Sequence, residues 1–273
     1  MNLKKIGVAA AIAAGLGMSF NAFAQETVTV AGSTTVLPVM QKISEAYMHA
    51  HPEVTIELSG GGSGNGIKAL VDGLTQIAMS SREIKSGEVT LAKSKNVEPN
   101  QITVAVDAIV PVVHPENPVG NLTVDQLRSI YKGEVKNWKE LGGKDHPIVV
   151  VSRDTSSGTY ESWEGLVMKK QRITPRALLQ ASNGAVVQTV AKNANAIGYV
   201  GIGYLGDSIQ AVQVGGVTAT AENVLADKWP LARELYLYTN GKPAAAVGKF
   251  VDYTVGAEGQ KLVKEVGFIP LSK

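Results

Sequence analysis

The 273-residue sequence contains no cysteine, which excludes both a disulfide framework and a cysteine-linked lipid anchor. It has only four histidines, and histidines without cysteine partners do not favour a structural zinc site. We therefore expect neither a resident metal nor a cofactor.

Long apolar runs are also scarce, and the clearest one lies near the beginning. Lys4 and Lys5 precede an apolar stretch over residues 6–20, which ends in Ala22-Phe23-Ala24. A basic start, an apolar middle and a small-x-small site are typical of a secretory signal peptide. The stretch is short for a membrane span, which needs about 20 apolar residues. We therefore predict cleavage after Ala24 and a periplasmic protein that is not anchored to the membrane.

An excess of charge of either sign is missing as well. The 26 Lys and Arg residues include the two of the signal segment, which leaves 24 basic residues against 24 acidic ones. A neutral chain does not favour a nucleic acid or an anionic membrane as a partner. About 250 residues suit two lobes of ordinary size or one large domain.

What the sequence does contain is a repeated strand–turn–helix unit. Alternating or apolar runs predict strands over residues 27–30, 54–58 and 77–79, and helical spacing predicts helices over 36–50 and 67–74. Such repetition indicates a parallel sheet with helices on its faces. Ligands of these sheets bind beyond the carboxyl ends of the strands, where the turns into the helices lie.

A second unit follows a long apolar strand over residues 102–113. The remaining elements that we predict are a helix over 122–131, a strand over 148–151, a helix through Trp163 and Leu166, a strand over 196–205, a strand over 234–239 and a helix over 245–266. We expect the strands over 102–113 and 196–205 to join two lobes. The predicted organisation is a signal peptide over 1–24, a first lobe over 25–110 and 206–273, and a second lobe over 111–205.

Three of the predicted turns are rich in hydroxyl groups. They are Ser33-Thr34-Thr35, Ser63 within a glycine run, and Ser157-Gly158-Thr159, which follows Arg153. The first backbone N–H groups of a helix have no partner inside it, and the helix dipole is positive there. Small residues let an anion approach these groups, and the arginine fork can hold two oxygens of an oxyanion. Each turn alone fits an ordinary helix cap, but together they indicate an anion site.

Other anion-binding and catalytic motifs are absent from the sequence. No glycine run ends in the Gly-Lys-Ser/Thr of a nucleotide-binding loop, and Asn65 takes the place of the third glycine of a dinucleotide-binding turn. No G-x-S-x-G surrounds a serine, so Ser157 has little support as a hydrolase nucleophile.

The chain resembles the periplasmic phosphate-binding proteins of ABC importers, in their shorter branch. The motifs that carry the resemblance span the chain in order: Ala31-Gly32-Ser33-Thr34-Thr35-Val36, Ser59-Gly60-Gly61-Gly62-Ser63-Gly64, Ser80-Ser81-Arg82-Glu83-Ile84, Tyr131-Lys132-Gly133 with Asn137-Trp138, and the stretch from Arg153 to Thr159. The resemblance implies an α/β protein of the type II-like binding-protein fold, with two lobes of mixed sheets flanked by helices and two crossing strands as a hinge.

The resemblance also implies a set of phosphate ligands. The first lobe would contribute Thr34, the Thr35 amide and Ser63. The second lobe would contribute Arg153, Ser157, the Gly158 N–H and Thr159, and Ser33 is a further candidate. Phosphate would be released to a membrane permease of the ABC type, and no catalytic group would be needed.

One position departs from the pattern of longer members, where a carboxylate after the third strand accepts the proton of monohydrogen phosphate. Ser81 stands there, followed by Arg82. A hydroxyl can also accept a hydrogen bond, so Ser81 is counted among the predicted phosphate ligands. We hypothesise that Asp107, the acid within the long strand, takes that role; the alternative is a hinge carboxylate bonded to the backbone or to Arg82. Arg82 is in turn either a further phosphate ligand or a member of a structural ion pair.

The predicted function is high-affinity binding of inorganic phosphate by a monomeric, non-catalytic receptor that closes by hinge bending. Three alternatives stay open: the same fold with sulfate or molybdate as ligand, a secreted phosphatase, and a secreted adhesion protein.

Overall fold

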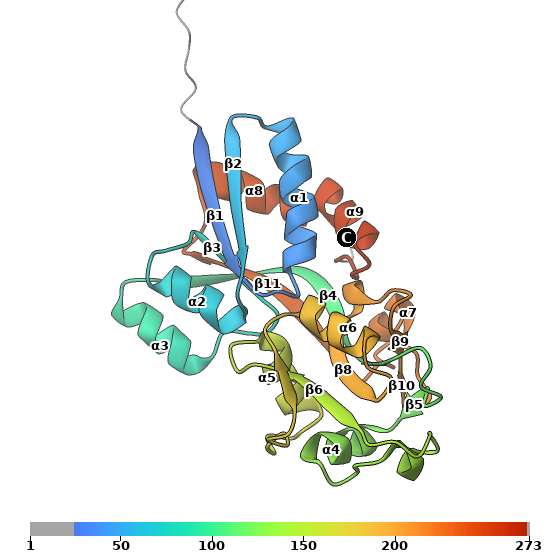
Figure 1. Cartoon of the computed structure of the whole chain (residues 1–273). Helices are drawn as coiled ribbons and strands as arrows, with labels where there is room; N and C mark the ends of the chain where they lie inside the picture. Colours follow the sequence, from blue (N-terminus) through green and yellow to red (C-terminus); the bar gives the residue numbers. More distant parts are fainter. Residues whose placement is uncertain (1–24, 272–273) are drawn as a thin grey trace, which may run out of the picture.

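The fold is built on one mixed sheet of nine strands with helices on both faces (Figure 1). A computed structural model describes residues 25–271, and the predicted signal segment lies outside them. The first stretch of the chain forms β1 (Glu26–Gly32), α1 (Leu37–Ala50), β2 (Val54–Gly60), α2 (Ser63–Val71), β3 (Ile77–Ser80), α3 (Ser86–Ser94) and β4 (Pro99–Val113). The middle forms β5 (Asn121–Leu122), α4 (Val124–Lys132), η1 (Trp138–Leu141), β6 (Val149–Arg153), α5 (Gly158–Leu166), β7 (Leu178–Gln180), α6 (Asn183–Ala191), β8 (Ala196–Gly201), η2 (Ile202–Tyr204), β9 (Gln210–Ala211), β10 (Gln213–Val214) and α7 (Ala221–Leu225). The chain ends with β11 (Ala232–Asn240), α8 (Ala245–Val255) and α9 (Ala257–Glu265).

The strand order places two antiparallel strands between two parallel groups. The order is β2-β1-β3-β11-β4-β8-β6-β7, and β9 pairs with β4 beside this path. Strands β2, β1 and β3 are parallel to one another, as are β8, β6 and β7. Between them, β11 is antiparallel to β3 and to β4, and β4 is antiparallel to β8. The predicted mixed α/β fold is therefore confirmed.

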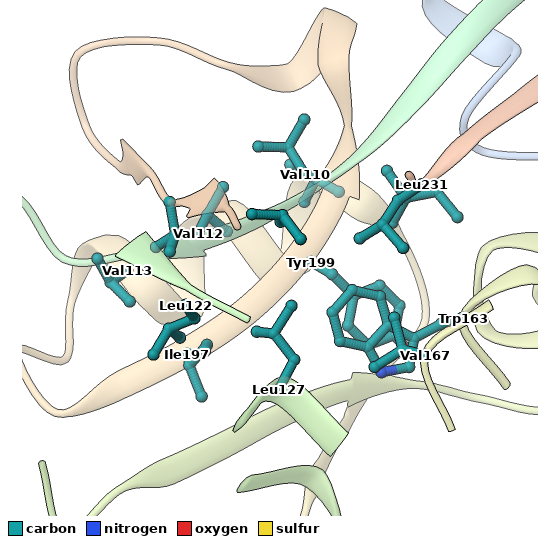
Figure 2. Close-up of a cluster of buried hydrophobic side chains, with 14 of the residues drawn as sticks. Val110, Val112, Val113, Leu122, Leu127, Trp163, Val167, Ile197, Tyr199 and Leu231 are labelled. Carbon is teal, nitrogen blue, oxygen red and sulfur yellow. The ribbon is translucent and has the colours of Figure 1, made fainter. Parts of the chain in front are cut away.

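Two large apolar clusters divide the molecule into two lobes. One cluster joins α1, α8 and α9 to the sheet around Val30, Ile43 and Phe250, and we call this part the first lobe. The other contains Val110, Trp163 and the parts of α4 to α7 that pack on it, and we call it the second lobe. Figure 2 shows its centre, where the rings of Trp163 and Tyr199 are stacked at 4.3 Å. Strands β4 and β11 run between the lobes (Figure 1).

The packing places the return to the first lobe later than the sequence indicates. The strand predicted over 196–205 corresponds to β8, which pairs with β4 and β6 inside the second lobe. Ile209, Val214 and Leu231 also belong to the second cluster. The chain then returns along β11, so the boundary at residue 205 stays a prediction and the packing favours one near residue 231.

Local sequence explains where most helices begin and end. In α1 a proline stands in the first turn, and Met40, Ile43 and Tyr47 recur at helical spacing and are buried. The single helix predicted over 245–266 is wrong in one respect, because Gly256 adopts an extended conformation with φ −75° and ψ 174°. It ends α8 and caps α9, so two helices replace one.

No helix within residues 25–271 combines the length and the apolar composition that crossing a bilayer requires.

Candidate functional site

The hydroxyl-rich turns of both lobes meet at the junction between the lobes. Thr35 Oγ1, in the turn after β1, lies 2.8 Å from Thr159 Oγ1, at the start of α5. The Gly64 amide donates to the Ser156 carbonyl at 3.0 Å, and the Ser156 hydroxyl donates to the Gly61 carbonyl at 3.3 Å. Thr35 and Thr159 are 124 residues apart in the sequence, so the fold brings together turns that the sequence predicted separately.

A tight backbone packing positions the first-lobe turns. Gly32 has a φ of +136°, and a Cβ there would run into the Met79 carbonyl oxygen and lie 3.1 Å from Gly66 Cα. A glycine is needed for both reasons, the left-handed conformation and the close approach. The amides of Gly61 and Gly62 both donate to the Gly32 carbonyl, at 2.8 and 2.9 Å. The ends of β1 and β2 are thereby held against the beginning of α2.

Two of the predicted ligands accept hydrogen bonds from backbone amides beside helix starts, and Ser157 caps α5. Ser33 Oγ accepts from the Thr35 amide at 3.2 Å and from the Val36 amide at 3.4 Å. Ser157 Oγ accepts from the Tyr160 amide at 3.2 Å. A serine that accepts a capping bond still has its own hydroxyl hydrogen to donate, so the capping role and an anion-binding role are compatible. An anion at the Thr35 amide would compete with the Ser33 hydroxyl.

Ser63 and Ser81 form a buried hydroxyl pair in the first lobe. Their Oγ atoms are 3.3 Å apart, and Ser63 Oγ accepts from the Ser81 amide at 3.0 Å. Gly158 of the second lobe packs directly on this pair, because a Cβ at Gly158 would lie 2.7 Å from Ser81 Oγ and closer still to Ser63 Oγ. The backbone at the start of α5 therefore approaches both hydroxyls.

Arg153 lies behind the second-lobe turn, where it is 1% exposed. Its Nε donates to the Gln180 carbonyl at 2.9 Å, and one terminal nitrogen donates to the Ala181 carbonyl at 3.0 Å. Nη1 is buried without a hydrogen-bond partner among the described residues. A buried guanidinium with a free N–H is a strong donor for an oxyanion.

Comparison with known proteins identifies the family to which the chain belongs. Residues 21–258 match the PBP superfamily domain. The chain is 30% identical to the phosphate-binding protein PstS of Borreliella burgdorferi, covering 90% of both chains. It is 31% identical to PstS of Bacillus subtilis, covering 91% of this chain and 82% of the relative. The chain belongs to this family of phosphate-binding proteins.

Solved structures of the family agree with the fold. One is a phosphate ABC transporter substrate-binding protein from Clostridium perfringens with bound phosphate, with a TM-score of 0.85 and 37% identity over 90% of this chain and all of that one. Another is an ABC-type phosphate transport receptor from Vibrio cholerae, with a TM-score of 0.73 and 34% identity over 89% of this chain and all of that one. The expected type II-like binding-protein fold is confirmed.

Asp107 lies on β4 near the junction between the lobes, and its side chain is fully buried. Its Oδ2 accepts from Arg233 Nε at 2.9 Å and Nη2 at 2.8 Å, and its Oδ1 accepts from the Ile202 amide at 2.9 Å. Burial raises the pKa of the Asp107 carboxyl, and the Arg233 guanidinium opposes that shift. The ion-pair partner is thus Arg233 and not Arg82.

Arg82 is occupied by carboxylates on both lobes. Its terminal nitrogens bind the two oxygens of Glu88 at 2.8 and 2.7 Å, and its Nε lies 2.7 Å from Glu161 Oε2 on α5. Lys85 Nζ is 2.7 Å from the same Glu161 oxygen. Burial raises the pKa of Glu88, but the bonds from Arg82 outweigh it and hold that pKa below its usual value. These contacts favour the ion-pair role that the sequence left open for Arg82. We call Arg82, Lys85, Glu88 and Glu161 the interlobe ion-pair network.

Sequence reasoning missed three residues that touch the hydroxyl cluster. Asn183 Nδ2 donates to Thr34 Oγ1 at 3.3 Å and to Thr35 Oγ1 at 3.0 Å. Arg233 reaches the same cluster from β11, and the Tyr204 hydroxyl donates to the Thr34 carbonyl. Burial raises the pKa of Tyr204 to about 12, so it keeps its hydrogen near neutral pH. Asn183 carried a signal, because Ser182-Asn183-Gly184 is a further small polar turn between a strand and a helix.

Proposed function

We propose that this chain binds inorganic phosphate between its two lobes in the periplasm and delivers it to an ABC-type membrane permease. The observation that carries the proposal is the direct contact of Thr35 with Thr159, which unites the hydroxyl turns of both lobes in one buried cluster. The phosphate-binding names of the relatives and the phosphate held by the Clostridium perfringens protein support it.

In this proposal both lobes donate hydrogen bonds to the anion. The donors are Thr34, Thr35 and Ser63 from the first lobe, with Ser33 beside them, and Arg153, Ser157, Gly158 and Thr159 from the second. Ser81 contacts the anion as the acceptor of its proton. The amides of Gly158 and Thr159 are the first two of α5 and have no partner within that helix. The Arg153 guanidinium supplies a charge-assisted bond to an oxyanion, and the helix amides add bonds from partial charges.

Hydrogen-bond donors on both lobes favour closure of the lobes around the anion. An anion that bridges the lobes binds the closed arrangement more tightly than the open one, so it shifts the population towards closure. The hinge would lie at β4 and β11, the strands that run between the lobes. Binding and release of this kind make and break no covalent bond, so we propose a receptor and not an enzyme.

The proton of monohydrogen phosphate needs an acceptor, and Ser81 is better placed than Asp107. Both Asp107 oxygens already accept bonds from Arg233 and Ile202. If the Ser81 hydroxyl donates to Ser63, its lone pairs remain to accept the phosphate O–H. Sulfate carries no such proton, so this acceptor would favour phosphate.

The proposal is tested first on the purified mature protein. We expect a chemical assay to find phosphate carried through purification, and calorimetric titration of the phosphate-free protein to show tight binding of phosphate with weak binding of sulfate and molybdate. No turnover of a chromogenic phosphate ester is expected. Tighter binding of sulfate or molybdate than of phosphate would contradict the proposed ligand.

The same titration separates the two candidate acceptors. Replacing Ser81 by alanine is expected to weaken phosphate binding about fivefold and to leave sulfate binding unchanged, since one hydrogen bond contributes about 1 kcal/mol. Replacing Asp107 by alanine is expected to change both affinities together, because its loss disturbs Arg233. Unchanged selectivity in the Ser81 variant, with lost selectivity in the Asp107 variant, would assign the proton to Asp107 instead.

The interlobe ion-pair network is expected to favour the closed arrangement. Replacing Glu161 by glutamine removes the partner of Arg82 and Lys85 on the second lobe, so we expect phosphate to dissociate about three- to tenfold faster, as for a partly exposed ion pair. The difference should shrink as salt is raised, which stopped-flow measurement from 0.05 to about 0.5 M salt would show. Glu134, which pairs with Lys132 within the second lobe, provides the matched control. Equal effects of the two glutamine substitutions would count against a role in closure.

A further inference from the structure

Asp107 and Arg233 face each other on the two crossing strands. They are direct partners in the antiparallel register of β4 and β11, and their side chains are 0% and 7% exposed. Both carboxylate oxygens are engaged, because Oδ2 accepts two bonds from Arg233 and Oδ1 accepts one from the Ile202 amide. The pair is therefore built into the junction itself.

The guanidinium reaches beyond the carboxylate into the hydroxyl cluster. Arg233 Nη2 lies 3.0 Å from Thr159 Oγ1 and 3.4 Å from Thr35 Oγ1, in addition to 2.8 Å from Asp107 Oδ2. A terminal guanidinium nitrogen carries two hydrogens, and here three acceptors lie within reach. The N–H that points at the threonines can therefore serve an anion oxygen at the same place, while the other N–H keeps its bond to Asp107.

The neighbouring amide fixes the direction of the hydrogen bonds. Asn183 Oδ1 accepts from the Gly201 amide at 3.3 Å, so its Nδ2 faces Thr35 and can only donate. Arg233 can only donate as well. Thr35 Oγ1 then accepts from both and gives its own hydrogen to Thr159, which in turn directs its hydrogen outwards. The two donors therefore leave the Thr159 hydroxyl oriented as an anion donor.

We propose that Arg233 is a second guanidinium ligand of the bound anion, and that Asp107 and Asn183 are positioning residues that aim it and the Thr159 hydroxyl. The proposal rests on the proposed function and adds a ligand to it. Because a guanidinium donates and never accepts, Arg233 would strengthen binding of phosphate and sulfate equally. Discrimination between the two anions would remain with Ser81.

The competing explanation is that Arg233 only neutralises the buried Asp107. A single R233Q substitution does not separate the two, since it leaves Asp107 buried without a partner and destabilises the protein in either case. The double variant D107N/R233Q removes both charges, so no unpaired buried charge remains, and keeps a polar side chain at each position. The R233K variant keeps the charge and loses the fork.

Calorimetric titration with phosphate and with sulfate, together with thermal unfolding without ligand, tests the proposal. For D107N/R233Q we expect cooperative unfolding and affinities for both anions that fall by the same factor, about 10- to 100-fold. For R233K we expect cooperative unfolding and about tenfold weaker binding, because one ammonium held by Asp107 cannot also reach the anion.

Wild-type affinity in either folded variant would overturn the proposal and reduce Arg233 to a partner of Asp107. A fall for phosphate alone would also overturn it, since a pure donor cannot distinguish the anions. Failure of the unmodified protein to bind phosphate or sulfate would instead contradict the proposed function, so the two failures are distinguishable.

Discussion

Replacing Gly158 by alanine is expected to weaken phosphate binding roughly 100-fold without unfolding the protein. The added Cβ would lie 2.7 Å from Ser81 Oγ and closer still to Ser63 Oγ, both on the opposite lobe. Such overpacking costs up to about 3 kcal/mol, and it arises only when the lobes close. Titration with phosphate measures the loss, and solution scattering would show a ligand-saturated variant that stays more extended than the unmodified protein.

Gly165 provides the matched control for this substitution. It lies on the same helix α5, and a Cβ there meets nothing within 4 Å. Alanine at either position raises helix propensity by about 1 kcal/mol, so the two variants share the effect on α5 itself. We expect the G165A variant to bind phosphate as the unmodified protein does. Equal affinity of the two variants would mean that Gly158 does not pack against the first lobe in the bound state.

Replacing Arg153 by lysine is expected to weaken phosphate binding by about 100-fold. The guanidinium is 1% exposed, two of its nitrogens donate to the Gln180 and Ala181 carbonyls, and Nη1 is left for the anion. A lysine ammonium cannot keep both carbonyl bonds and also reach the anion, and a charge-assisted hydrogen bond contributes about 1.5–3 kcal/mol. Titration with phosphate measures the change.

The R128K variant controls for the loss of a largely buried guanidinium, since the Arg128 side chain is 14% exposed. Arg128 Nε donates to the Val167 carbonyl at 2.7 Å, and its Nη2 is also buried without a partner among the described residues. Its ion pair is with Asp125 on the same helix α4. We expect a similar fall in melting temperature in both variants but weaker phosphate binding only in R153K. Unchanged binding in R153K would remove Arg153 from the ligand set.

Much of the fold could be predicted because its elements have strong periodic patterns. Strands such as β1 and β2 are predicted by alternation over the whole segment, and the amphipathic helix α1 is predicted by helical spacing. The missed elements are short or weakly patterned: α7 has five residues, β9 and β10 two each, and α3 buries only Ala92. Periodicity over so few residues cannot distinguish an element from a loop.

The site was predictable in part for a different reason. Helix starts can be found locally, so the turns around Thr34, Ser63 and Ser157 stood out without knowledge of the fold. The partners of the charged residues could not be found in this way. Arg233 meets Asp107 through the register of β4 and β11, across 126 residues, and Arg82 meets Glu161 only after the lobes come together. Both pairings depend on tertiary structure.

The two crossing strands make the second lobe a single continuous insertion in the chain of the first lobe. The chain enters it along β4 and leaves it along β11, and Ala108 and Ala232 are paired neighbours in that ribbon. Everything between them is one uninterrupted segment whose ends adjoin. Relatives could therefore trade this half of the anion site by a single replacement with two nearby junctions, and chimeras cut at these alanines would keep the framework of the recipient intact.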